Sequence, residues 1–246
     1  MGVKVVKDLV YSYIEIDEIV QKLVDTASFQ RLKRIKQLSS SYIFPSTNHT
    51  RYEHSIGVMH LACNFFEVLE KDFKKYGLTE ERISFLRLHI KLAGLLHDVG
   101  HPPFSHLGEK FLDKNEIIAC IKNEYSDLVS VEKTFYNNGE LMGKEHELLS
   151  CYCILRKFYK ILKEEIDKNI NMLKHFIESW VKSHSIRNEE LFQFADDDFY
   201  FYRFAVERQE KAAKILLTNI LWRVLKEYNL PVEYSHDAPF IFIIKE

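Results

Sequence analysis

Residues that interrupt helices are scarce in this chain, which has only 8 glycines and 5 prolines among 246 residues. Long stretches instead place apolar residues at helical spacing. The sequence contains no internal repeat, no low-complexity tract and no clear linker. These features predict an all-α fold, with minor β-structure near the two ends of the chain.

Cysteine and long apolar runs are scarce too. The 4 cysteines cannot form a disulfide framework for a chain of this length, and Cys151 and Cys153 within a predicted helix indicate packing. No segment approaches the roughly 18 apolar residues that a membrane span needs. Met1–Asp8 also lacks the apolar core of a secretory signal. We therefore expect a cytoplasmic protein with no membrane partner.

Several functional motifs are missing as well. The sequence has no P-loop, no HExxH and no paired CxxC, which excludes P-loop motors, zincins and zinc fingers. The net charge of −2 offers no overall attraction to polyanions. We therefore do not expect nucleic acid as a partner, although a local basic patch stays open.

The most informative stretch is Ile90–His106. Its apolar first half predicts a buried helix, which ends in the pair His97 and Asp98 and is followed by Gly100 as a stop. An isolated histidine in such a helix is more often a hydrogen-bonded core residue. The adjacent carboxylate, the helix end and the nearby His101 and His106 instead favour a divalent metal site.

Two further segments carry candidate binding residues. In the predicted helix that opens at Arg51, His54 lies one turn later, which offers a guanidinium for phosphate and an imidazole for a metal; a core role for His54 is the alternative. The predicted helix Ser28–Leu38 carries cations that form either a solvated face or a phosphate-binding cluster.

Later in the chain, His146 and the acidic run Asp196–Asp198 each admit two interpretations. His146 lies between Glu145 and Glu147, whose charges would raise its pKa as a general acid requires; an exposed histidine at a polar helix start is the alternative. Asp196–Asp198 favours a helix N-cap with an acidic first turn over a metal site, because consecutive residues point to different sides of a helix.

The remaining pattern predicts the other elements. Residues 5–16 predict a strand or hairpin, Asp17 predicts the N-cap of a helix to about Thr26, and Asn137–Gly139 predicts a turn. Ala238–Ile244 predicts a terminal strand. Further helices are expected over residues 51–69, 80–98, 108–124, 145–165, 168–183 and 199–227.

Two motifs together resemble a known family. Arg51–Val58 and Leu95–His106 are similar to the HD-domain phosphohydrolases, within them to the branch of the deoxynucleoside triphosphate triphosphohydrolases, and Asp25–Leu38 matches that branch too. The resemblance covers about residues 5–115 and resumes at 144–150 and 191–230. It implies an HD-domain helical bundle over residues 1–190, a C-terminal helical extension over 191–246, and one or two bound divalent metals.

The resemblance also implies roles for individual residues. The implied metal ligands are His54, His97 and Asp98. The implied catalytic set is His106 as the acid, Glu109 supporting it, and His101 and His146 on the phosphates. The implied substrate contacts are Arg51 on a phosphate, Gln37 on the sugar, and Arg31 and Lys33 on phosphate or an effector. The metal stays open among Mn, Mg, Fe, Zn and Ni.

The chain departs from the family at the fourth metal ligand. The family's later pattern Asp-x-Asp-Arg/Lys-x-Asp-Tyr does not follow His146, and Asp167 is a weak substitute. Either the chain lacks that helix or the sequence omits it. Three functions therefore stay open: hydrolysis of deoxynucleoside triphosphates to nucleoside and triphosphate, hydrolysis of another nucleotide phosphate ester, and a catalytically impaired nucleotide-binding or oligomerising module. The resemblance implies a nucleotide substrate, leaves a nucleotide effector open and implies a homo-oligomer.

Overall fold

Helices make up most of the part of the chain that the computed structural model describes, which is residues 4–38, 48–75, 79–166, 232–234 and 242–244. The α-helices are α1 (Glu18–Val24), α2 (Ala27–Gln30), α3 (Arg51–Lys75), α4 (Glu80–Leu96), α5 (Lys114–Tyr125), α6 (Val131–Phe135), α7 (Glu145–Cys153) and α8 (Tyr159–Ile166). Short 3-10 segments form η1 (Arg31–Arg34) and η3 (Ser105–Phe111), and a π-helical segment, η4 (Ile154–Phe158), joins α7 to α8. The predicted fold class is confirmed.

The described residues contain three two-stranded antiparallel sheets. Strands β1 (Lys4–Asp8) and β2 (Ser12–Ile16) pair antiparallel, as predicted, and the Asp17 side chain accepts a hydrogen bond from the Val20 amide at 3.0 Å to begin α1. The predicted turn lies between β3 (Tyr136–Asn137) and β4 (Glu140–Leu141), where Asn138 and Gly139 have positive φ. The sequence did not reveal this central hairpin or α6. Near the C-terminus, β6 (Phe242–Ile244) pairs with β5 (Val232–Tyr234), in line with the predicted terminal strand.

The predicted helix over Ser28–Leu38 is wrong in its second half. Helix α2 ends at Gln30, η1 covers one further turn, and the backbone is extended at Ile35. The extended segment pairs with the residues before α3: the Gln37 amide donates to the His49 carbonyl at 3.1 Å, and the Arg51 amide donates to the Ile35 carbonyl at 2.8 Å. Tertiary pairing has therefore overridden the helical spacing of the apolar residues.

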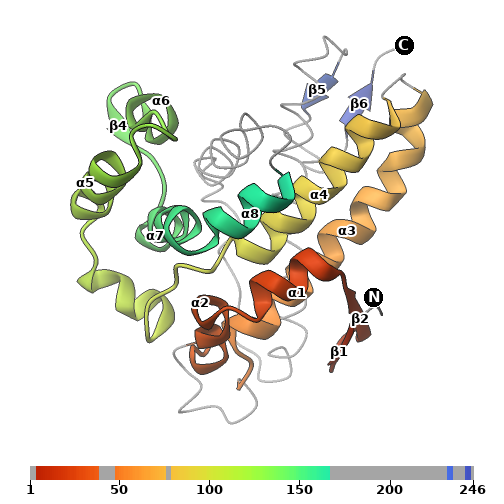
Figure 1. Ribbon diagram of the computed structural model, residues 1–246, viewed down its shortest axis with the longest axis horizontal. Coiled ribbons are helices and arrows are strands. Elements are labelled where there is room, and N and C mark those ends of the chain that lie inside the picture. The colour runs from red at the N-terminus through yellow and green to blue at the C-terminus, as the bar shows by residue number, and fades with distance from the viewer. Residues whose placement is uncertain (1–3, 39–47, 76–78, 167–231, 235–241, 245–246) are drawn as a thin grey trace.

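Helices α3 and α4 pack against each other as a long antiparallel pair (Figure 1). Their packed faces form part of the core, whose largest side chains include Ile56 and Phe66 of α3 and Leu86 and Ile90 of α4. The pair comes closest at Gly94, where an added Cβ would lie 2.8 Å from the Cα of Met59. The start of α3 and the end of α4 therefore meet at one end of the pair.

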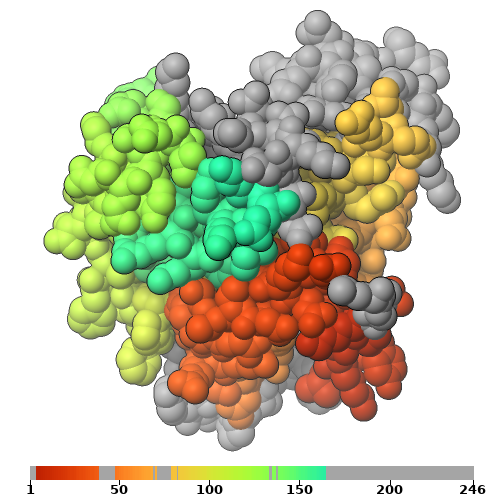
Figure 2. All heavy atoms as spheres, in the orientation of Figure 1, coloured from red at the N-terminus to blue at the C-terminus, as the bar shows by residue number. Residues whose placement is uncertain are grey.

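The helices α7 and α8 complete the described fold. Helix α7 contacts α5 and η3, and α1 contacts α8. On the surface, α8 lies between the N-terminal segment and the α5–α6 region (Figure 2). Among the described helices, none combines the length and low polarity needed to cross a membrane. The predicted helices at 168–183 and 199–227, Asp167, Asp196–Asp198 and the domain boundary at residue 190 lie outside the described residues.

Candidate active site

The start of α3 positions two of the predicted site residues. Thr50 and Glu53 form a capping box: the Glu53 carboxylate accepts from the Thr50 amide at 2.5 Å, and the Thr50 hydroxyl accepts from the Glu53 amide at 3.5 Å. This cap begins the helix at Arg51, so that Arg51 and His54 lie one turn apart on its buried side.

The end of α4 brings His97 and Asp98 to the same place. The close approach at Gly94 lets the two helices meet, and the His97 Nδ1 lies 2.8 Å from the Gly94 carbonyl oxygen. A proton on Nδ1 donates to that carbonyl, so the unprotonated His97 Nε2 faces His54 across the helix pair, at 3.2 Å from the His54 Nε2.

His54, His97 and Asp98 form a compact triad, as predicted for metal ligands, and all three are at least 95% buried. The His54 Nε2 lies 3.2 Å from the His97 Nε2 and 3.4 Å from the Asp98 Oδ2, and the His97 Nε2 lies 3.5 Å from the Asp98 Oδ1. Donors bound to one ion at about 2.1 Å would lie roughly 3–3.5 Å apart. The spacing of the triad therefore fits a shared divalent ion.

The charge states of the triad fit a metal as well. Burial lowers the pKa of His54 well below its usual value, although Asp98 opposes this. Burial alone would raise the pKa of Asp98, but the neighbouring His97 and Arg51 outweigh it and hold that pKa well below its usual value. A neutral imidazole and an ionised carboxylate are the forms that bind metals.

Arg51 does more than offer a guanidinium for phosphate. Its Nη1 donates to the Asp98 Oδ2 at 2.6 Å, and its Nε donates to the Ser105 hydroxyl at 3.1 Å. Its Nη2 also contacts Ser105, lies 3.4 Å from the Gln37 carbonyl oxygen, and approaches the His106 Nε2 at 3.2 Å. Arg51 therefore hydrogen-bonds the Asp98 carboxylate of the triad and lies beside His106, the residue predicted to act as the acid.

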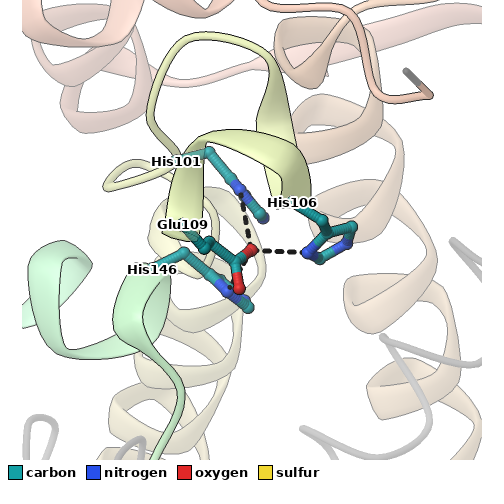
Figure 3. Close-up of side chains that lie close together, drawn as sticks. All are labelled: His101, His106, Glu109 and His146. Atoms are coloured by element: carbon teal, nitrogen blue, oxygen red, sulfur yellow. Dashed lines mark hydrogen bonds and ion pairs between the residues drawn. The ribbon is translucent and has the colours of Figure 1, made fainter. Parts of the chain in front are cut away.

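The four remaining catalytic candidates form a second cluster beside the triad (Figure 3). The Glu109 Oε1 lies 2.5 Å from the His106 Nδ1, 3.0 Å from the His146 Nδ1 and 3.8 Å from the His101 Nδ1. The rings of His101 and His146 stack at 4.1 Å. On its other side, the His101 Nε2 lies 3.4 Å from the Asp98 Oδ1, so that this ring joins the two clusters.

His146 is buried, so its interpretation as an exposed histidine is wrong. Its nearest carboxylate is Glu109, not a sequence neighbour. The Glu147 carboxylate instead accepts from the Lys144 amide at 2.5 Å and caps α7, and Glu145 lies 3.7 Å from the Lys114 Nζ. Glu109, 3.0 Å from the His146 Nδ1, is therefore the nearer carboxylate, and the flanking Glu147 lies 3.9 Å from the His146 Nε2.

A close contact between the loop after α4 and helix α7 builds this second cluster. A Cβ added at Gly100 would lie 2.1 Å from the Ser150 amide nitrogen, and the Gly100 amide donates to the Ser150 hydroxyl at 2.7 Å. That hydroxyl donates in turn to the His146 carbonyl at 2.8 Å. Gly100 thus serves close packing beyond its predicted role as a helix stop, and it brings His101 onto His146.

Burial and charge separate the protonation states in the second cluster. Burial lowers the pKa of His101 to about 3, even though Asp98 opposes this. Burial would raise the pKa of Glu109, but hydrogen bonds from His106 and His146 outweigh it and lower that pKa. His101 is therefore a neutral imidazole and Glu109 a carboxylate near neutral pH.

The predicted substrate contacts differ in their surroundings. The Gln37 side chain is buried, and its Oε1 has no hydrogen-bond partner in the described structure. The Arg31 guanidinium donates to the His101 carbonyl at 2.7 Å and to that of Val99, so it clamps the loop after α4. Lys33 is exposed, with its Nζ 4.6 Å from the centre of the Tyr52 ring.

The HD domain model matches residues 51–217, which contain both clusters and both motifs. The chain belongs to the HD-domain family. This confirms the resemblance predicted from Arg51–Val58 and Leu95–His106.

Individual relatives place this HD-domain chain close to one branch. It is 38% identical over 112 residues to the deoxynucleoside triphosphate triphosphohydrolase SAMHD1 homolog of Dictyostelium discoideum, covering 45% of this chain and 21% of the relative. It is 34% identical over 166 residues to SAMHD1 of Gallus gallus, covering 66% and 26%. The putative HD domain-containing protein L394 of Acanthamoeba polyphaga mimivirus is 32% identical over 178 residues, covering 68% and 34%. The chain thus spans about a fifth to a third of these relatives.

A solved structure supports the fold of the HD-domain chain. A hypothetical protein from Aquifex aeolicus matches with a TM-score of 0.53 at 23% identity, covering 100% of this chain and 54% of that chain. At that identity the similarity concerns the fold alone.

Two serines of the HD domain were missed by the sequence analysis. Ser105 receives the Arg51 guanidinium and donates to the Gln37 carbonyl at 3.2 Å. Ser150 joins the loop to α7. The only signal for Ser150 is its position one helical turn after His146, and nothing near Ser105 distinguishes it from a loop hydroxyl.

Proposed function

We propose that the chain is a metal-dependent phosphohydrolase that cleaves deoxynucleoside triphosphates to nucleoside and triphosphate. The observation that carries this proposal is the direct contact of a metal-type triad with an acid–carboxylate cluster through Arg51 and His101. The names of the Dictyostelium discoideum and Gallus gallus relatives supply the substrate class.

His54, His97 and Asp98 would hold the metal. A divalent ion bound there supplies a Lewis acid that neutralises phosphoryl charge and makes water a better nucleophile near neutral pH. Asp98 also needs Arg51 to keep its orientation, because its Oδ2 accepts from the guanidinium while the Oδ1 faces His97.

His106 is the residue suited to protonate the leaving oxygen. It is the half-exposed member of the second cluster, with 48% of its side chain accessible, so it can reach a substrate. In the reaction, a water oxygen bonds to the α-phosphorus, the bond from phosphorus to the nucleoside O5′ breaks, and the His106 Nε2 gives its proton to O5′. Glu109, whose Oε1 lies 2.5 Å from the His106 Nδ1, orients the ring. Proton transfer by a positioned general acid is worth roughly 10²–10⁴-fold in rate.

The remaining residues suit recognition of the nucleotide. The free Oε1 of Gln37 can accept a hydrogen bond from a sugar hydroxyl. Arg51 borders the phosphate position with its Nη2, and the rings of His101 and His146 flank it. Lys33, exposed on η1, suits an outer phosphate or an effector nucleotide. A homo-oligomer follows from the family resemblance as part of the same proposal.

The test is product analysis. The purified chain is incubated with Mn²⁺ and each of the four deoxynucleoside triphosphates, and the products are separated by ion exchange. We expect nucleoside and intact triphosphate, with turnover lost in Asp98→Asn and His106→Gln. Release of phosphate or pyrophosphate would instead show cleavage of a phosphoanhydride bond and contradict the proposed reaction.

A second candidate is a nucleotide-binding module without turnover. It is favoured by the triad itself, since the described residues contribute three metal ligands and no fourth. It predicts that deoxynucleoside triphosphates raise the melting temperature of the chain without being hydrolysed. Calorimetry gives the melting temperature and product analysis gives the turnover on the same samples. A raised melting temperature without products would support the binding module over the enzyme.

A further inference from the structure

The Arg31 side chain, which the resemblance assigns to a phosphate or an effector, is already engaged with the protein itself. Its Nη1 donates to the His101 carbonyl at 2.7 Å, and its Nη2 donates to the Val99 carbonyl. Cys153, the last residue of α7, hydrogen-bonds the same guanidinium. A guanidinium binds phosphate best through two parallel N–H groups. Here the two Nη atoms that would supply such a pair donate to backbone carbonyls.

We propose that Arg31 is a positioning residue and not a phosphate contact: it holds the loop after α4 so that the His101 ring reaches both the triad and Glu109. Because this role concerns turnover at the same site, it rests on the proposed function. Arg31 acts through the backbone of the loop and does not touch the substrate.

The two carbonyls lie just beyond the end of a helix, where no further helical turn supplies donors for them. Helix α4 ends at Leu96, and the backbone then turns, with the His101 amide donating to the Asp98 carbonyl at 3.1 Å. Val99 and His101 are both fully buried. Buried carbonyls beyond a helix end need donors from elsewhere in the chain. Arg31 supplies a donor to each of them.

Helix α7 holds the residue between these two carbonyls. The Gly100 amide donates to the Ser150 hydroxyl at 2.7 Å, and an added Cβ at Gly100 would lie 2.1 Å from the Ser150 amide nitrogen. Arg31 and Ser150 together therefore hold three successive residues of the loop, Val99, Gly100 and His101. Without Arg31, the loop keeps only the contact at its middle residue.

The His101 ring depends on this backbone for its place between the two clusters. Its Nε2 lies 3.4 Å from the Asp98 Oδ1, its Nδ1 lies 3.8 Å from the Glu109 Oε1, and the ring stacks on His146 at 4.1 Å (Figure 3). A displacement of about 1 Å in a catalytic site can cost on the order of 10²-fold in rate. Loss of the Arg31 hydrogen bonds should therefore lower turnover, although the side chain lies outside the reacting groups.

Lysine is the substitution that separates the positioning role from phosphate binding. An ammonium group keeps the positive charge, so it can still attract a phosphate. It lacks the planar fork with which the guanidinium serves two carbonyls at once. Arg31→Lys therefore keeps most of a charge-based phosphate contact but loses the double hydrogen bond to the loop.

Steady-state hydrolysis with saturating Mn²⁺ is the first measurement. We expect Arg31→Lys to lower kcat at least about tenfold and to leave KM within about twofold, because the ground-state contacts of the nucleotide are kept. Arg34→Lys, which alters an exposed arginine of the same 3-10 segment, is the matched control and should change neither constant. A raised KM with unchanged kcat in Arg31→Lys would overturn the proposal in favour of phosphate binding, and unchanged kinetics would overturn it as well.

Amide hydrogen exchange tests the hold on the loop without any assay of activity. We expect residues 97–103 to exchange at least about tenfold faster in Arg31→Lys than in the wild type. Exchange in α3 should stay the same, which also shows that the variant is folded. Unchanged exchange in the loop would overturn the proposal. A wild type that hydrolyses no nucleotide would contradict the proposed function, and the exchange rates would still decide whether Arg31 holds the loop.

Discussion

At the scale of single residues, Ser105 connects Arg51 and Gln37, which lie far from it in the sequence. Its hydroxyl accepts from Arg51 and donates to the Gln37 carbonyl, and it is fully buried. Phe104 and Ser105 both have left-handed backbone, with φ of 66° and 55°. Such strain in residues other than glycine is often found at functional sites, where the surrounding contacts sustain it.

We expect Ser105→Ala to lower the free energy of unfolding by about 1–3 kcal/mol, because two buried polar groups lose their partner. Ser105→Gly removes the same hydroxyl but relieves the left-handed strain, so it should cost less. Urea denaturation measures both. Equal stability of Ser105→Ala and the wild type would show that the buried hydroxyl contributes nothing.

His101 makes stability depend on pH. Burial holds the pKa of His101 at about 3 in the folded chain, whereas an exposed histidine titrates near 6.5. The unfolded chain therefore binds a proton that the folded chain does not. The resulting stability is complete above about pH 6.5 and is lost as the pH falls towards about 3.

The measurement is urea denaturation of the metal-free chain at about pH 7 and about pH 5. We expect the loss of unfolding free energy between these values to be about 2 kcal/mol smaller in His101→Gln than in the wild type. An identical loss in both proteins would mean that His101 titrates normally in the folded chain.

At the scale of elements, the contact between α3 and α4 sets the spacing of the triad. An added Cβ at Gly94 would lie 2.8 Å from the Met59 Cα, which is backbone and cannot turn aside. Gly94→Ala should therefore push the helices apart, cost about 1–3 kcal/mol of stability and separate His54 from His97.

Thermal unfolding and Mn²⁺ titration measure the two effects of Gly94→Ala. The matched control is Ser84→Ala on an exposed position of the same helix, which should change neither. Normal Mn²⁺ affinity in a destabilised Gly94→Ala would show that the triad does not depend on this contact.

At the scale of the whole molecule, the triad of His54, His97 and Asp98 joins the start of α3 to the end of α4. An ion that binds only the folded chain therefore stabilises all of it. At a free concentration about 100 times its Kd, Mn²⁺ should add about 2.7 kcal/mol and raise the Tm by roughly 5–10 °C relative to the chelator-treated chain.

Differential scanning fluorimetry checks this effect, with Asp98→Asn as the control that should lose most of the shift. Asp98→Asn keeps the size of the side chain while removing its charge. A Tm rise of the same size in both proteins would place the stabilising ion elsewhere.

The local sequence determined the fold class, the start of a helix and the place of one candidate site. The scarcity of glycine and proline predicted the all-α fold, Asp17 predicted the start of α1, and the adjacent His97 and Asp98 predicted a metal-type site at the end of α4, to which the family resemblance added His54. These predictions rest on spacing along one element or on adjacent residues, which short-range geometry determines.

Tertiary structure decided the rest. The helix predicted to Leu38 stops at Arg34 because the extended residues beyond it pair with those before α3. His146 contacts the Glu109 carboxylate and Ser105 accepts a hydrogen bond from Arg51, across 37 and 54 residues of sequence. No periodicity encodes such contacts, because they depend on how two separate segments pack. The sequence determined which groups were available, and the approach of α3 to α4 and of the loop at Gly100 to α7 decided which of them meet.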